Sequence, residues 1–149
     1  MKRIILTLAI LAGTASVAAA GPPPSPATPV SLTIKKSGAN LVVVVKMKGL
    51  TKKNAAYKPS LDVRTVSPKG EYGVQSNGPG MPVAVHPYGG VDGATSGPAK
   101  LVLGIPRQIA RFTFGLDAIK HPRTVRIAAQ AFGSEDDPGV KTKFYTFRP

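Results

Sequence analysis

Apolar and polar residues alternate along most of the chain beyond residue 30, and a period of two is the pattern of half-buried β-strands. Helical periodicity is nearly absent. The best candidate is one turn at 116–120, close to Pro122, which disfavours helix in the residue before it. The pattern predicts seven strands, at 31–35, 41–48, 61–66, 101–105, 109–114, 124–132 and 140–147. We therefore expect an all-β domain.

The segment 41–48 is the strongest of these strand predictions because it is rich in β-branched residues. One of its faces is apolar throughout and consists of Leu41, Val43, Val45 and Met47. On the other face, two valines are followed by Lys46 and Lys48. We therefore expect a central strand that is covered on both sides at one end and emerges into water at the other.

The architecture follows from the number and spacing of the strands. No unit of roughly 20–50 residues repeats along the chain, which excludes solenoids and propellers. Short strands separated by turns are best accommodated in two sheets packed face to face. The predicted fold is a single two-sheet β-sandwich of about seven strands.

The C-terminal part of the chain carries a resemblance to a known fold family. The segment Thr124-Val125-Arg126-Ile127-Ala128-Ala129-Gln130-Ala131-Phe132-Gly133, followed by an acidic turn and the strand ending Lys143-Phe144-Tyr145-Thr146-Phe147, resembles the last hairpin of fibronectin type III and related immunoglobulin-like domains. The early pair 31–35 and 41–48 is similar to their opening strands. The resemblance implies an immunoglobulin-like fold, which hosts binding, structural and appended enzyme modules alike.

The first twenty residues have the three parts of a secretory signal peptide. Lys2 and Arg3 form a positive start, 4–12 is apolar, and 18–20 is a run of alanines suited to cleavage. The apolar stretch is shorter than the roughly 20 residues that a membrane-spanning helix needs, which argues against a retained anchor. We predict cleavage after Ala20 and a mature protein in the periplasm or outside the cell.

Removing 20 of the 149 residues leaves 129, enough for one domain with its own core. Residues 21–29 are rich in proline and predict an extended spacer. Residues 30–149 are predicted to form the β-sandwich domain. The chain has no cysteine, so disulfides and thiolate metal sites are excluded and the hydrophobic core must hold the fold together.

Charge is the strongest feature of the composition. Without its first twenty residues the chain has 18 basic and 7 acidic residues, a net charge of +11. Such a field attracts the polyanions found outside the cytoplasm, among them lipopolysaccharide and teichoic acids. The candidate anion-binding residues are lysines on exposed strand faces: Lys35, Lys46, Lys48, Lys141 and Lys143. The alternative is that the scattered charge only keeps the protein soluble.

The segment 67–98 is the most unusual part of the chain, because 13 of its 32 residues are glycine or proline. We predict a long loop here, and long loops in compact domains are often functional. Its candidate binding residues are Tyr72, His86, Tyr88 and Asp92. Two alternatives stay open, an irregular edge of the sandwich and a hairpin in which strands at 72–75 and 82–86 flank a turn at 77–78.

Reactive groups are scarce in this sequence. A triad of His86, Asp92 and Ser96 would lack the G-x-S-x-G turn that exposes a nucleophile. The possible copper ligands Met47, Met81, His86 and His121 lack the spacing of a copper site, and the acidic run 135–139 lacks the layout of a calcium loop. We therefore predict no catalytic residue, no cofactor and no metal.

The expected function is that of an exported, non-catalytic binding or structural module of the periplasm or cell surface. A sharper version is a basic protein that binds anionic envelope polymers, and another envelope protein is the alternative partner. The third hypothesis is an enzyme with its site in the segment 67–98.

Overall fold

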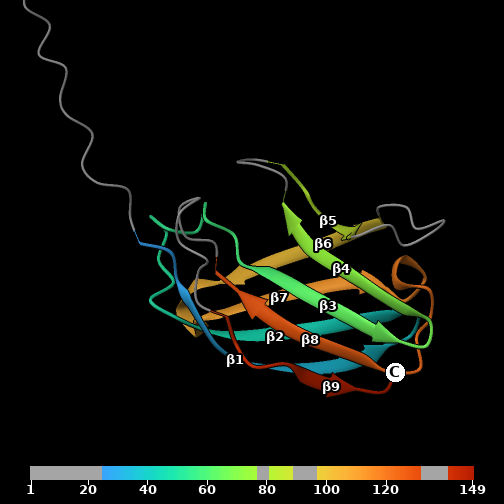
Figure 1. Cartoon of the computed structure of the whole chain (residues 1–149). Coiled ribbons are helices and arrows are strands. Elements are labelled where there is room, and N and C mark those ends of the chain that lie inside the picture. Colours follow the sequence, from blue (N-terminus) through green and yellow to red (C-terminus); the bar gives the residue numbers. More distant parts are fainter. Residues whose placement is uncertain (1–24, 77–80, 89–96, 132–140) are drawn as a thin grey trace, which may run out of the picture.

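The computed structural model describes residues 25–76, 81–88, 97–131 and 141–149 (Figure 1). The predicted signal peptide and its cleavage site lie outside these ranges. The strands are β1 (Thr28–Ser37), β2 (Asn40–Lys48), β3 (Ser60–Val66), β4 (Lys69–Ser76), β5 (Val83–Pro87), β6 (Gly97–Gly104), β7 (Ile109–Gly115), β8 (Val125–Gln130) and β9 (Tyr145–Phe147). Two 3₁₀ turns, η1 (Ile105–Arg107) and η2 (Asp117–Ile119), flank β7.

The nine strands pair antiparallel in one continuous order, β1-β2-β7-β6-β5-β4-β3-β8-β9. β1 also lies against β8 and β9, so the two ends of the sheet come together. The result is a nearly closed barrel, and closing a sheet on itself removes exposed strand edges. Figure 1 shows β3, β4 and β8, the second wall, crossing β2, β6 and β7, the first wall.

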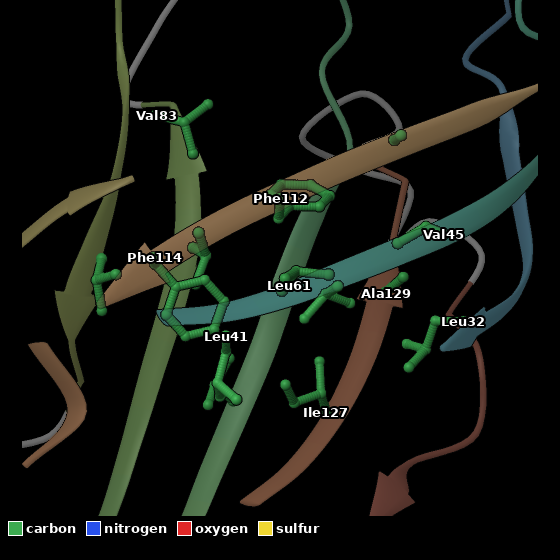
Figure 2. Packing of buried hydrophobic residues seen from close by; sticks show 14 of the residues in the cluster. Leu32, Leu41, Val45, Leu61, Val83, Phe112, Phe114, Ile127 and Ala129 are labelled. Atoms are coloured by element: carbon green, nitrogen blue, oxygen red, sulfur yellow. The ribbon is translucent and has the colours of Figure 1, made fainter. Parts of the chain in front are cut away.

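The core fills the space between the two walls. The side chains of Phe112 and Phe114 on β7 belong to one buried cluster with Leu61 on β3 and Ile127 on β8 (Figure 2). Each of these four residues is 2% exposed or less. Burying a large apolar side chain contributes about 1.5–3 kcal/mol, so this cluster supplies much of the stability of a chain without disulfides.

The structure confirms the all-β class and the orientation of the predicted central strand. The apolar face of β2, namely Leu41, Val43, Val45 and Met47, is buried, while Lys46 and Lys48 are exposed. The predicted single helical turn corresponds to η2. Within the described ranges, no helix is long and apolar enough to cross a membrane.

The finer prediction of a two-sheet sandwich of about seven strands differs from the structure, which has nine strands in one nearly closed sheet. The predicted spacer 21–29 also ends too late, because β1 begins at Thr28. The predicted strand 140–147 is shorter, since Lys141 makes an isolated bridge to Gln130 and β9 begins only at Tyr145.

The largest correction concerns the segment 67–98, which we expected to be a long loop. It contains all of β4 and β5 and the start of β6. The hairpin alternative is confirmed, because Gly73 pairs with His86 and Val74 with Val85; the turn predicted at 77–78 lies outside the described residues. β4 and β5 have neighbours on both sides in the sheet, so the irregular-edge alternative is wrong.

Candidate functional site

A groove of about 630 Å³ lies on the outer face of β6 and β7, on the first wall. Its lining consists of Lys100, Val102, Gly104, Pro106, Arg107, Ile109, Arg111 and Thr113, and we call it the β6–β7 groove. The volume is within the roughly 300–1,000 Å³ typical of ligand sites. Three of the eight lining residues are cationic, and no carboxylate of the described residues lines the groove.

Strand alternation places two of these cations. The alternate residues Ala99, Leu101, Leu103, Ala110, Phe112 and Phe114 pack into the core. The residues between them therefore face outward, including Lys100 on β6 and Arg111 on β7. Lys100 pairs with Thr113 and Val102 pairs with Arg111, so the two cations occupy diagonal positions on neighbouring strands. Diagonal neighbours are close enough for long side chains to contact the same ligand.

The third cation, Arg107, is placed by the turn between the two strands. It ends η1, and Gln108 follows it in the left-handed conformation with φ of 53°. The Gln108 side chain accepts a hydrogen bond from the Leu50 N–H at 2.8 Å and donates to the Leu50 carbonyl at 2.7 Å. The Gln108 carbonyl also accepts a hydrogen bond from the Met47 N–H at 2.7 Å. These bonds fix the turn against the end of β2 and the residues directly after it, and so fix the end of the groove.

The surroundings of the groove differ at its two sides. On β2, Lys46 pairs with Ile109 of the groove lining and is exposed. Towards η2, a second hollow of about 390 Å³ shares Lys100 and Thr113 with the groove and reaches Asp117. The β6–β7 groove is therefore cationic at Arg107, whereas the neighbouring hollow carries a carboxylate.

The five lysines predicted to bind anions do not form one site. Lys35, Lys46 and Lys48 are exposed on β1 and β2. Lys141 lies beside the second wall, where it pairs with the Asp62 carboxylate. The Lys143 ammonium is 5.4 Å from the centre of the Tyr145 ring. Lys46 is therefore the member of the predicted set that adjoins the β6–β7 groove.

Three cations on or beside the second wall, Arg64, Arg126 and Lys141, are engaged with other groups of the protein. All three lie over the Phe144 ring, at 4.7 Å for Arg64, 4.8 Å for Lys141 and 5.3 Å for Arg126. Asp62 pairs with both Arg64 and Lys141, and Glu71 lies 4.0 Å from Arg64. This wall thus offers less free positive charge than the first wall.

The structure separates the residues of the predicted binding loop. Tyr72 is fully buried in the core, so its assignment to a binding loop is wrong. The reason is its place on β4, where alternation turns its side chain inward. Tyr88 is exposed and His86 is half-buried on the opposite face of the hairpin. Asp92 lies outside the described residues.

The residues weighed as catalytic or metal-binding groups do not gather in one place in the described ranges. Asp92 and Ser96 of the triad, and the acidic run 135–139, lie outside the described residues. Met47 is buried in the core, whereas Met81 and His121 are exposed. In the part of the chain that the structure describes, no three His, Cys, Asp or Glu side chains gather closely enough to hold a metal ion.

The sequence analysis missed all three cations of the groove, although the signal was present. Alternation in 101–105, extended back by one residue, and in 109–114 would have placed Lys100 and Arg111 on the same outer face once the two strands were paired. The position of Arg107 depends on the conformation of Gln108, which no pattern reveals. Comparisons of the chain with protein-family models, with curated proteins and with solved structures returned no match.

Proposed function

We propose that this protein is an exported, non-catalytic binding module that holds anionic polymers of the cell envelope in the β6–β7 groove. The observation that carries the proposal is the gathering of Lys100, Arg107 and Arg111 in one groove without a carboxylate among its described lining residues. Cations that face the same solvent-filled space attract the same anion, and their contributions add. This gathering favours binding over the alternative that the charge serves only solubility, for which no groove is needed.

A polymer suits the groove better than a small anion does. The adjoining hollow shares Lys100 and Thr113 with the groove, so a chain-like ligand held in the groove can extend beyond it along the two strands. Val102 is 49% exposed and, with Ile109, offers an apolar floor between the cations. Phosphate-bearing glycopolymers combine regularly spaced anions with less polar sugar faces, so they match both features.

Export is part of the proposal and is supported by the tripartite start of the sequence. An intact-mass measurement on protein from its native host should give an N-terminus at Gly21. Retention of Met1 to Ala20 would contradict export with cleavage. The immunoglobulin-like resemblance stays a prediction, and the proposal does not depend on it.

The experiment compares two triple variants of equal charge. One is Lys100→Gln, Arg107→Gln and Arg111→Gln in the groove; the control is Lys52→Gln, Lys53→Gln and Lys69→Gln, which changes three exposed lysines outside the groove lining. Each protein is titrated against lipopolysaccharide, teichoic acid and duplex DNA between 50 and 200 mM salt. Over roughly this range of salt concentration, the release of counterions makes the affinity for a polyanion fall steeply.

We expect the groove variant to bind lipopolysaccharide or teichoic acid at least about tenfold more weakly at the lower salt concentration. Log affinity should also decrease less steeply with log salt concentration. The magnitude of this slope should be smaller by about 2 to 3, because each phosphate contact contributes about 0.7–0.9. The control should lose less than about threefold. Equal losses in both variants would show that only net charge matters, and tight binding to DNA alone would reject an envelope polymer.

A further inference from the structure

A second pocket, of about 310 Å³, lies on the outer face of the second wall. Its lining consists of Ser60, Leu61, Asp62, Gln75, Tyr88 and Gln130. These residues come from β3, β4, β8 and the position directly after β5, so paired strands fix most of the pocket. We call it the Tyr88 pocket. Its volume is at the lower end of the range for small-ligand sites.

Tyr88 is held in place by three features of the hairpin. Its backbone N–H donates to the Glu71 carbonyl at 2.8 Å, and its hydroxyl donates to Gln75 Oε1 at 3.1 Å. Gly73 lies under the ring, and a Cβ at this position would overlap the Tyr88 hydroxyl. A glycine here lets the aromatic ring settle directly on the sheet. The ring therefore forms a preorganised wall of the pocket although 41% of the residue is exposed.

The charge in the pocket is already compensated. The Asp62 carboxylate, whose side chain is 19% exposed, pairs with Lys141 and lies 3.5 Å from Arg64. Burial, and to a smaller extent the Asp62 carboxylate, raises the pKa of Tyr88 above its ordinary value, so the phenol stays neutral near pH 7. A cationic ligand would compete with Lys141 and Arg64 for Asp62. An anionic ligand would meet the carboxylate itself.

The polar groups that line the pocket suit hydroxyl groups. Gln75 and Gln130 each carry a carboxamide with both donors and an acceptor, Asp62 offers carboxylate oxygens, and Ser60 offers a hydroxyl. Adjacent hydroxyls on a ring both donate and accept, so they can bond to such a mixed set. An aromatic wall complements the apolar C–H groups of the same ring.

We propose that the Tyr88 pocket binds a neutral, hydroxyl-rich ligand of the size of one sugar ring. The site is separate from the β6–β7 groove, because it shares no lining residue with it and belongs to the opposite wall. It recognises its ligand through hydrogen bonds and an aromatic contact rather than through net charge. The proposal therefore stands whether or not the groove binds a polymer.

The test is a titration of the purified ¹⁵N-labelled protein with the methyl glycosides of glucose, galactose, mannose and N-acetylglucosamine, followed by NMR. We expect saturable shifts of the Gln75 and Gln130 side-chain amides with at least one glycoside, with a roughly millimolar Kd typical of small ligands with few contacts. Raising the salt about tenfold should leave the Kd within about twofold, in contrast to polymer binding in the groove.

Two variants and one control locate the binding. Tyr88→Ala removes the wall, and Gly73→Ala displaces the ring while keeping it; each should weaken binding at least about tenfold. Tyr57→Ala is the matched control, because Tyr57 is 43% exposed but does not line the pocket. The backbone spectrum of each variant checks that it is folded. Absence of saturable shifts with all four glycosides, or equal affinity of Tyr88→Ala and Tyr57→Ala, would overturn the proposal.

Discussion

The two walls of the barrel carry cations in different states. On the first wall, Lys100, Arg107 and Arg111 face one groove that no described carboxylate lines. On the second wall, Arg64 and Lys141 are paired with Asp62 and stack on an aromatic ring. The same residue types therefore stand in two different surroundings, one without and one with a carboxylate partner. A net charge of +13 says nothing of this division.

The comparison also explains why a count of exposed lysines was a poor guide to the site. An exposed pair in water contributes about 0–1 kcal/mol, so Asp62 does not greatly stabilise the barrel through Lys141. It does lower the positive potential of the second wall. On the first wall, Asp117 lines the neighbouring hollow and not the β6–β7 groove, so no described carboxylate offsets the three cations there.

The largest effect is expected from a substitution at a buried position of β2. The comparison of the two walls depends on knowing which residues of a strand face the core and which face water. Val45 is fully buried, between Leu32 on β1 and Ala110 on β7. Val45→Asp would bury an unpaired charge and should unfold the protein, a loss of more than about 4 kcal/mol. The neighbouring residue Lys46 is exposed, so Lys46→Glu should alter the free energy of unfolding by less than about 1 kcal/mol.

Thermal melts of the two variants provide the measurement. Lys46→Glu should also weaken polymer binding, since Lys46 adjoins the groove lining at Ile109. Equal tolerance of both substitutions would mean that the faces of β2 are assigned wrongly. The assignment of Lys46 and the groove residues to the outer face of the first wall would then fail as well.

A smaller effect is expected when the second wall is made to resemble the first. Asp62→Asn combined with Glu71→Gln removes the carboxylates that pair with Arg64 and Lys141. In the groove-deficient triple variant, this change should raise affinity for teichoic acid by about two- to fivefold, which corresponds to the energy of one or two weak surface pairs. The measurement is a titration at low salt. No gain would show that stacking on Phe144, rather than pairing with carboxylates, withholds these cations.

Much of the fold could be predicted because burial alternates along its regular strands. The inward residues of β2 and β7 follow a period of two without interruption, so their faces were readable from sequence. β4 and β5 were harder, because Gly70, Gly73 and Pro87 interrupt that pattern. In the structure Gly73 makes room for Tyr88, a contact between strands that sequence order does not show.

The candidate sites were predictable only in part, for a similar reason. Tyr88 and Tyr72 were both predicted as binding residues of one loop, but Tyr88 is exposed whereas Tyr72 is a core residue. Closure of the barrel could not be inferred either, since it depends on β1 reaching β8 and β9 across the whole length of the chain. The groove lies on the consecutive strands β6 and β7, whereas the Tyr88 pocket is assembled from residues as far apart as Ser60 and Gln130, which no local pattern brings together.

The smallest effect is expected at Tyr72, which faces the core from the second wall, whereas Tyr88 on the same wall faces water. The Tyr72 hydroxyl is buried without a hydrogen-bond partner among the described residues. Removing an unsatisfied buried hydroxyl leaves no group unpaired, so Tyr72→Phe should leave stability unchanged or raise it by up to about 1 kcal/mol. Chemical denaturation near pH 7 measures this. A clear loss of stability would mean that the hydroxyl has a partner after all.

The pH dependence of the same variant supplies an independent check. Burial raises the pKa of Tyr72 above its ordinary value of 10.0, so the folded protein keeps a proton that the unfolded chain loses. Where the unfolded state binds fewer protons, stability falls as pH rises, so the wild type should lose stability from about pH 10 upward. Tyr72→Phe should lose less over this range, whereas Tyr57→Phe, a change at an exposed tyrosine, should follow the wild type. Identical alkaline profiles for all three proteins would show that Tyr72 ionises as freely in the barrel as in the unfolded chain, and would contradict its burial on the inner side of β4.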